Sequence, residues 1–295
     1  MPLQNTELEV LATEIRRLTI TSIHAARSGH PGGSLSAADL LAYIWGELLK
    51  NPVPGLDGER HRFVLSKGHA CPALYAAAAM AGLLMPNETS TLRKLGSRLQ
   101  GHPHVLDCDF AETSTGSLAQ GFSVALGMAL GFRHQDNQTR VYALLGDGEL
   151  QEGEVWEAAM SAAHFGLSNL TAIIDFNKMQ SDDLNENIMG LEPLADKWQA
   201  FGWNTRNIDG HDFEDIRSAF DAAHAETNRP TVIIAHTIKG KGVSYMEGIP
   251  VWHGSVLLRD HEAISALTGL GLSDADAHAW ISGNIPNEIN EGFRL

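Results

Sequence analysis

Residues 146–183 read GDGELQEGEVWEAAMSAAHFGLSNLTAIIDFNKMQSDD, and two apolar runs, residues 141–145 and 170–174, lie just before and within this stretch. We interpret the runs as buried parallel strands joined by a crossover helix, so that their carboxyl ends meet at one edge of a sheet. Ligands bind at that edge in open α/β sheets. Asp147 and Asn177 follow the two runs and offer oxygen atoms to a hard cation such as Mg²⁺. Because the flanking glycines let backbone amides approach a phosphate closely, the stretch predicts a site for Mg²⁺ and a diphosphate.

The rest of the chain alternates helical and strand patterns. Helical patterns cover residues 7–27, 34–49, 70–84, 121–132, 193–201 and 212–226, and strand patterns cover residues 62–66, 203–208 and 231–235. Ser34 or Ser36 is expected to cap the second helix. Residues 95–115 show little periodicity, which is typical of functional or mobile segments. The alternation predicts an α/β fold with a mainly parallel sheet and helices on both faces.

The composition favours a globular enzyme and argues against several other classes of protein. Hydrophobic residues make up 43% of the chain and charged residues 19%, with a formal net charge of −15. Scattered lysines and arginines in an acidic chain do not favour a nucleic-acid partner, and no apolar stretch is long enough to span a membrane. The two cysteines, Cys71 and Cys108, form neither a disulfide framework nor a metal-type pair. Together with an N-terminus unlike a signal peptide, this predicts a cytoplasmic protein.

Histidines form a second group of candidate site residues. His30, His69 and His102 each follow a glycine, in a loop or at the end of a regular element. Imidazole can donate to sugar hydroxyls, polarise a carbonyl or contact phosphate near physiological pH. The alternative is that each is an ordinary loop residue with a satisfied hydrogen bond. His253 is a fourth candidate, with the same alternative.

Simpler interpretations also exist for the charged residues. Asp147 and Asn177 could cap helices. Lys239 and Lys241, in a KGKG loop, could meet phosphate or form a solvated basic turn. The carboxylates at the start of the crossover helix suit the helix dipole; they are Glu149, Glu152, Glu154 and Glu157.

Six ordered motifs resemble those of one enzyme family. GDG followed about thirty residues later by asparagine is similar to the thiamine diphosphate signature. SGHPGG, SKGHA, GHPH, TSTGSLAQG and WHG resemble, in order, motifs of the N-terminal half of transketolase. The chain most resembles the N-terminal subunit of split, two-chain transketolases. The resemblance covers essentially the whole chain and implies that residues 1–295 form a single diphosphate-binding domain of that type.

The resemblance implies roles for the matching positions. Asp147 and Asn177 would bind Mg²⁺, or another divalent cation such as Ca²⁺ or Mn²⁺, through their side chains, and Met179 through its backbone carbonyl. The residues that would contact the cofactor, thiamine diphosphate, are His69, Gly116, Leu118, Gly146, Asp147, Gly148, Asn177 and His253. His30, His69 and His102 would act as catalytic residues facing the sugar. Glu152 and Glu157 resemble carboxylates placed at a subunit interface.

The implied reaction is ketol transfer, in which the C2–C3 bond of a ketose breaks and the two-carbon unit passes to an aldose. In this family a glutamate on a pyrimidine-binding domain activates the cofactor, and that domain is not in this sequence. We therefore expect a partner, the transketolase C-terminal subunit, in an α2β2 assembly acting on sugar phosphates. The alternatives are a 1-deoxyxylulose-phosphate-synthase-like enzyme and a non-catalytic assembly subunit.

The sequence departs from the family pattern at three places. Ser255 and Val256 follow the WHG motif where relatives often carry Ala-Pro or Lys-Ala-Pro. Ala119 stands where glycine is usual before Gln120, and Asp183 stands where glycine often follows the turn after Asn177. The first departure touches the loop, next to His253, that the resemblance places near the diphosphate and the substrate entrance.

Overall fold

A parallel five-stranded sheet organises the molecule. The computed structural model describes residues 2–49, 60–254, 256–291 and 293. The strands are β1 (Arg62–Leu65), β2 (Val141–Gly146), β3 (Leu170–Phe176), β4 (Asn204–Asp209) and β5 (Thr231–His236), in the spatial order β1-β2-β3-β5-β4. All four pairings are parallel. The predicted neighbours β2 and β3 pair in register, with Gly146 opposite Asp175.

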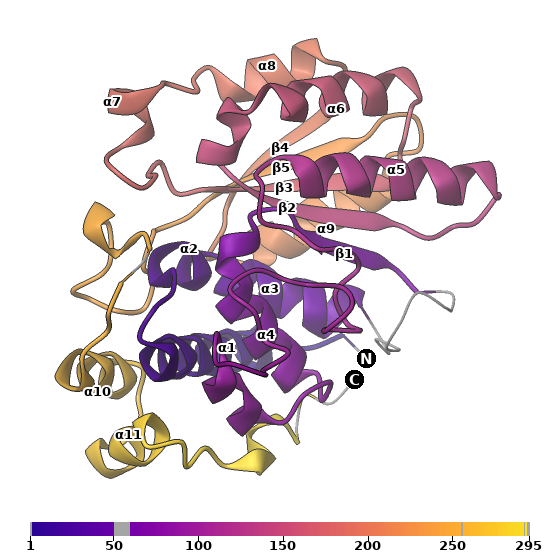
Figure 1. Ribbon diagram of the computed structural model, residues 1–295. Helices are drawn as coiled ribbons and strands as arrows, with labels where there is room; N and C mark the ends of the chain where they lie inside the picture. The colour runs from indigo at the N-terminus through magenta and orange to yellow at the C-terminus, as the bar shows by residue number, and fades with distance from the viewer. Residues whose placement is uncertain (1, 50–59, 255, 292, 294–295) are drawn as a thin grey trace.

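Helices cover both faces of the sheet, as the alternating pattern predicts (Figure 1). One face carries α5 (Gln120–His134), α6 (Gly153–His164) and α8 (Leu194–Ala200). The other carries α1 (Asn5–Ala26), α3 (Ala38–Tyr43), α4 (Cys71–Met80) and α9 (Phe213–Ala225). The short helix α2 (Pro31–Ser36) lies close to the sheet, and α10 (Asp260–Gly269) and α11 (Asp274–Ile281) pack outside α1.

Strand alternation divides the apolar side chains between two cores. In β2, Tyr142 and Leu144 face the core formed with α1, α3, α4 and α9, whereas Ala143 and Leu145 face the core formed with α5, α6 and α8. Successive strand residues point to opposite faces, so a strand covered on both sides is apolar throughout. This double burial explains why β2 and β3 appear in the sequence as continuous apolar runs.

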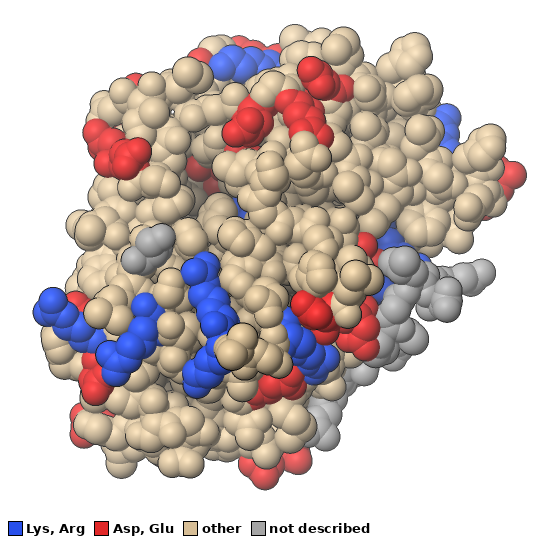
Figure 2. Space-filling model, viewed as in Figure 1, with Lys and Arg blue, Asp and Glu red and all other residues tan. Residues whose placement is uncertain are grey.

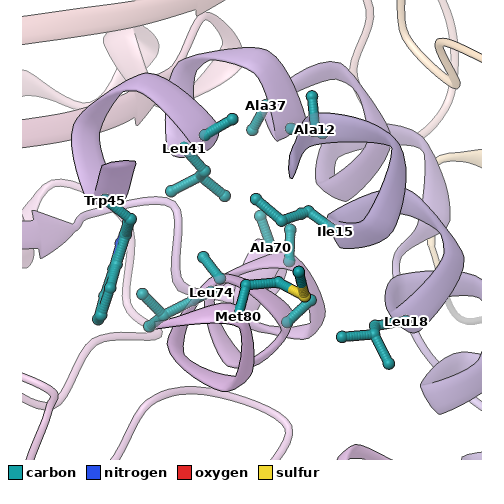
Figure 3. Close-up of a cluster of buried hydrophobic side chains, with 14 of the residues drawn as sticks. Ala12, Ile15, Leu18, Ala37, Leu41, Trp45, Ala70, Leu74 and Met80 are labelled. Carbon is teal, nitrogen blue, oxygen red and sulfur yellow. The ribbon is translucent and has the colours of Figure 1, made fainter. Parts of the chain in front are cut away.

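The larger core is built on the long helix α1. Ala12, Ile15 and Leu18 of α1 share a buried cluster with Leu41 of α3 and with Leu74 and Met80 of α4 (Figure 3). Alanines of α4 allow the close approach of these helices, because a small side chain keeps the backbones near one another. This packing joins α1, α3 and α4 into one core beneath the sheet.

The second predicted helix differs from the structure at its start. It begins at Pro31, three residues before Ser34, because proline suits the first helical turn. Neither Ser34 nor Ser36 caps it: the hydroxyl of Ser34 donates to the His30 carbonyl, and that of Ser36 donates to Asp175. The helix is also interrupted at Ala37, and its last turn, η1 (Ile44–Leu48), is a π-helix.

Short helical turns connect the main elements. They are η2 (Gly68–Ala70), η3 (Pro86–Thr91), η4 (Gly148–Gln151), α7 (Asn185–Ile188), η5 (Pro250–Trp252) and η6 (Asn287–Asn290). Residues 92–119 contain no helix or strand, and they include residues 95–115, where the sequence shows little periodicity. No helix in the described part of the chain is both long and apolar enough to cross a membrane.

Charged side chains are unevenly distributed on the face shown in Figure 2. Lys and Arg gather in the lower half of the view, over the elements beneath the sheet, while Asp and Glu dominate the upper half around α6 and α8 (Figure 2). Glu152 and Glu157, at the start of α6, are both exposed.

Candidate active site

Loops at the carboxyl ends of the strands enclose a cavity of about 280 Å³. Its walls come from α2 and from the loops that follow β1, β2, β3 and β5, joined by the segment before α5. The lining residues are His30, Gly33, Lys67, His69, Gly116, Leu118, Gly146, Asp147, Gly148, Glu149, Asn177, Met179, Gln180, Ser181, Lys239 and His253. Every candidate cofactor and metal residue from the sequence therefore lies here. Two larger hollows, of about 750 and 600 Å³, lie at the opposite edge of the sheet and contain none of them.

His102 is the one catalytic candidate outside the lining. Its ring packs behind Gly116, where an added Cβ would lie 3.3 Å from the His102 Cγ atom. The structure thus brings His102 to the wall of the cavity.

Asp147 is a buried carboxylate with few protein partners. It is 2% exposed, and its Oδ1 atom accepts a hydrogen bond of 2.7 Å from the Gly148 amide while Oδ2 accepts from the Lys178 amide. Burial, reinforced by the neighbouring charge of Asp175, raises the pKa of Asp147 to about 6. A bound cation would stabilise the charged form of this buried carboxylate.

Asn177 and Met179 present oxygen atoms beside Asp147. The Asn177 Oδ1 atom accepts from the Met179 amide at 3.2 Å, and the Met179 carbonyl accepts from Lys239 Nζ at 2.7 Å. Burial lowers the pKa of Lys239 to about 8, although Asp147 and Asp175 oppose the shift. Lys239 thus brings positive charge to the cavity, whereas Lys241 does not line it.

The donor set fits a hard divalent cation. A carboxylate, an amide oxygen and a backbone carbonyl are oxygen ligands of the kind that Mg²⁺ and Ca²⁺ take. The described residues contain no group of three or more His, Cys, Asp or Glu able to hold a metal. The protein oxygens alone would leave coordination positions open, and the oxygens of a diphosphate are suited to fill them.

Several buried polar atoms around the cavity lack a hydrogen-bond partner among the residues that the structure describes. They include His30 Nδ1, His253 Nδ1, Gln180 Nε2 and both amide atoms of Asn185. Buried polar groups are nearly always hydrogen-bonded in folded proteins. Their presence at this cavity indicates a polar ligand.

Three histidines form a triangle on one side of the cavity. The ring centroids of His30, His69 and His253 lie 5.2 to 5.8 Å apart. Burial, helped by neighbouring cationic side chains, lowers the pKa of His30 to about 4 and that of His253 to about 3, and it holds the pKa of His69 well below 6.5. All three are therefore neutral at pH 7, and each imidazole can donate one hydrogen bond and accept another.

Glycines permit the close approach of the site loops. A Cβ on Gly68 would lie 2.6 Å from the Thr115 Oγ1 atom and 3.0 Å from the Gly116 amide nitrogen. A Cβ on Gly254 would overlap the ring of His30. These contacts explain why SKGHA and WHG need glycine beside their histidines.

Sequence reasoning missed several residues of the site. Lys67 is 1% exposed and pairs with Asp175, which is fully buried. Glu149, interpreted from the sequence as a helix-dipole carboxylate, is instead 2% exposed and accepts from Ser66 Oγ and from the amides of Ala119 and Gly146. Both Lys67 and Glu149 closely follow an apolar run in the sequence. A charged residue in such a position is buried only if it is paired, so this position could have indicated a buried ion pair or hydrogen-bonded carboxylate.

The three departures from the family pattern have different surroundings. Ala119 adopts φ 73°, a left-handed conformation in which glycine is the favoured residue. The Asp183 carboxylate accepts hydrogen bonds from the Leu184 amide and from the Asn187 side chain. Ser255 lies outside the described residues, and the Val256 amide donates to the Gly29 carbonyl at 3.2 Å.

Known proteins resemble this chain along most of its length. The chain is 44% identical over 264 residues to the 6-deoxy-6-sulfo-D-fructose transketolase subunit SqwG of Clostridium sp. (strain MSTE9), covering 87% of this chain and 94% of the relative. It is 39% identical over 250 residues to a subunit of the apulose-4-phosphate transketolase of Phocaeicola vulgatus, covering 84% and 89%.

Longer relatives match through part of their sequence. Human transketolase is 42% identical over 257 residues, which cover 85% of this chain and 40% of the human protein. The crystal structure of Pichia stipitis transketolase in complex with sedoheptulose-7-phosphate superposes with a TM-score of 0.87 at 31% identity, over 98% of this chain and 44% of that one.

The family model described as "Transketolase, thiamine diphosphate binding domain" matches residues 8–293. With nearly the whole chain matched, and with relatives named as transketolase subunits aligned over most of their own length, this chain belongs to the thiamine diphosphate-binding N-terminal domain family of the transketolases.

Proposed function

We propose that this chain is the diphosphate-binding subunit of a two-chain transketolase. It would move a two-carbon ketol unit from a ketose phosphate, or a similarly anionic ketose, to an aldose acceptor. The observation that carries the proposal is the cavity itself, where residues from separate motifs meet around one space. The two relatives that are named as subunits, and that act by name on a sulfonated and a phosphorylated sugar, support the substrate class.

Thiamine diphosphate and a divalent cation are the proposed cofactors. Asp147, Asn177 and the Met179 carbonyl would hold the cation, which would neutralise charge on the diphosphate. The Gly148 amide, His69 and His253 would meet the diphosphate, and Gly116 and Leu118 would lie against the aminopyrimidine. Bound thiamine diphosphate supplies the carbon nucleophile and the electron sink for cleaving the ketose C2–C3 bond.

The histidines would handle the substrate. His30, His69 and His102 would orient its hydroxyl and carbonyl oxygens and move protons to and from them. Neutral imidazoles suit this role, because each can accept a proton at one nitrogen while donating at the other. The low pKa of His30 also keeps a proton from blocking the accepting nitrogen at pH 7.

A partner chain completes the proposal. Both of these relatives are named as subunits, which supports a C-terminal partner that supplies the pyrimidine-binding half, with Glu152 and Glu157 at the contact in an α2β2 assembly. A cytoplasmic location belongs to the same proposal; two buried free cysteines fit a reducing compartment.

Reconstitution tests the function. The full chain is mixed with its C-terminal partner, Mg²⁺ and thiamine diphosphate, and ketol transfer from a ketose phosphate to an aldose phosphate is measured. We expect turnover by the mixture and none by either chain alone. Full turnover by this chain alone would contradict the two-chain proposal, and a preference for pyruvate as donor would favour the 1-deoxyxylulose-phosphate-synthase-like alternative.

Asp147→Ala separates a catalytic role from a scaffold role. Removing the buried carboxylate should abolish Mg²⁺-dependent binding of thiamine diphosphate and reduce turnover by about 100-fold or more, since it takes away a ligand of the metal. Unchanged activity and unchanged cofactor affinity in the assembled complex would support a non-catalytic assembly subunit. The matched control is Asp212→Ala, which removes a surface helix cap of α9.

A further inference from the structure

Asp175 connects four of the segments that build the cavity, although it does not line the cavity itself. Its carboxylate accepts hydrogen bonds from Ser36 of α2, Lys67 after β1, Asn177 after β3 and Thr237 after β5. The side chain is fully buried in β3. A single acceptor thus joins loops that the sequence separates by up to about two hundred residues.

Lys67 extends this connection. Its ammonium group donates both to Asp175 and to the Gly33 carbonyl, the latter at 2.8 Å. Gly33 lies three residues after His30, and Lys67 lies two residues before His69. The ion pair therefore holds in place the two loops that carry the facing histidines.

The carboxylate also determines which way the Asn177 amide points. Asp175 pairs with the Lys67 ammonium group and accepts hydrogen bonds from the hydroxyls of Ser36 and Thr237. A carboxylate surrounded by an ammonium group and two hydroxyl donors offers only acceptor atoms. Only the NH₂ group of Asn177 can face it favourably, and the Asn177 Nδ2 atom lies 3.2 Å from Asp175 Oδ2. The Asn177 Oδ1 atom is thereby turned away, towards the Met179 backbone and the proposed cation site.

We propose that Asp175 is a positioning residue for the metal-dependent binding of thiamine diphosphate. It fixes the Asn177 amide with its oxygen towards the cation and, through Lys67, ties the histidine loops to the same strand. Asp175 touches neither the cation nor the cofactor. This inference rests on the proposed function of the cavity.

Asp175→Asn tests the inference in the full chain assembled with its C-terminal partner. The variant side chain can turn either an oxygen or an NH₂ group towards Asn177, so the orientation of Asn177 is no longer fixed. We expect the Kd for thiamine diphosphate, measured by calorimetric titration at fixed Mg²⁺, to rise about 10- to 100-fold, as is typical when the support of a metal ligand is removed. Without Mg²⁺, the variant and the wild type should bind equally weakly.

A double variant separates positioning from folding. Asp175→Asn alone leaves the Lys67 ammonium buried without its counter-ion, which could lower stability. Lys67→Met combined with Asp175→Asn removes both charges, so the thermal midpoint should recover towards the wild-type value while the Mg²⁺-dependent Kd stays raised. Glu112→Gln, at another buried carboxylate that pairs with Arg60 and Arg62, is the control and should leave the Kd unchanged.

The outcomes separate the positioning role of Asp175 from the proposed function of the cavity. Wild-type affinity in a folded Asp175→Asn chain, or an equal loss in Glu112→Gln, would overturn the positioning role alone. Recovery of both stability and affinity in the double variant would also overturn it, because the effect would then be a general cost of an unpaired charge. If the wild-type chain, assembled with its C-terminal partner, shows no Mg²⁺-dependent binding of thiamine diphosphate, the proposed function fails and this inference fails with it.

Discussion

Ala119 carries backbone strain at the entrance to α5. It has φ 73° and ψ −29°, is fully buried, and its amide donates to Glu149 at 2.9 Å. A left-handed conformation costs an L-residue other than glycine roughly 1–2 kcal/mol. The residue before α5 is held in this conformation by the contact to Glu149, which is itself tied to the loop after β2.

Ala119→Gly should therefore stabilise the protein. Relief of the strain exceeds the extra entropy of glycine in the unfolded chain, so we expect the free energy of unfolding to rise by about 0.5–1 kcal/mol. Urea denaturation at pH 7 measures it. A decrease would mean that the methyl group of Ala119 contributes more through packing than its backbone conformation costs.

Gly68→Ala should have the opposite effect. The added methyl group would meet the Thr115 hydroxyl and the Gly116 amide, and backbone cannot move aside as a flexible side chain can. We expect a loss of about 1–3 kcal/mol in the free energy of unfolding, together with weaker cofactor binding. Gly127→Ala is the control: it lies within α5, nothing lies within 4 Å of its added Cβ, and alanine there should stabilise by about 0.5–1 kcal/mol. Equal effects of the two substitutions would contradict the steric argument.

At the scale of elements, Glu149 joins three segments of the site. It accepts from Ser66 after β1, from the Ala119 amide before α5 and from the Gly146 amide at the end of β2. Both carboxylate oxygens are engaged by donors. Buried hydrogen bonds to Glu149 therefore hold the connection from β2 to α6 in place.

Glu149→Gln should loosen this junction. The NH₂ group of glutamine would face a donor on one side or the other, leaving at least one buried group unsatisfied, at a cost of about 1–3 kcal/mol. Denaturation combined with hydrogen exchange should show the loss, with faster exchange at the Gly146 and Ala119 amides. Unchanged protection of those two amides would argue against the role of Glu149.

The order of elements along the chain could be predicted from the sequence, but the order of strands in the sheet could not. The apolar runs and helical periods locate β2, β3, α1 and α9 within a few residues, because burial on one or both faces leaves a periodic pattern. Nothing in the local pattern shows that β5 inserts between β3 and β4. That choice depends on contacts between residues far apart in the sequence.

The site was predicted where motifs contain polar residues, and missed where a polar residue lies inside an apolar segment. Asp147, Asn177, His69 and His253 line one cavity, as expected from loops at strand ends. Lys67 and Asp175 were not predicted as a pair, because pairing between residues 108 positions apart becomes visible only after the strands are aligned. Whether the lining residues perform the expected roles stays a prediction.

For the whole molecule, buried histidines make stability depend on pH. Burial is the main cause that lowers the pKa of His30 and of His224 to about 4 and that of His253 to about 3. In the unfolded chain they titrate near their ordinary value of about 6.5. Between these pH values the unfolded state binds more protons than the folded state. The stability gained by burying the neutral imidazoles is therefore fully present above about pH 6.5 and is lost as the pH falls towards 4.

The free energy of unfolding should accordingly be flat with respect to these groups above about pH 6.5 and should fall between about pH 6.5 and 4. His224→Gln is the informative variant, because His224 lies outside the candidate site and bonds the Tyr142 hydroxyl at 2.8 Å. Its denaturation curves should show a shallower decline over that range than the wild type. A slope equal to that of the wild type would mean that His224 titrates alike in the folded and unfolded states.

The candidate residues lie at the carboxyl ends of the strands, so the amino ends of the strands can be altered without touching them. There, the turn between α5 and β2 contains exposed Gln135, Asp136 and Gln138, and none of the candidate residues lies in it. Exposed turns of this kind tolerate added sequence, because no buried contact has to be broken. A fluorescent reporter or an affinity tag inserted at residues 136–138 would thus sit across the sheet from the cavity, where it could follow assembly with a partner without obstructing the entry of substrate.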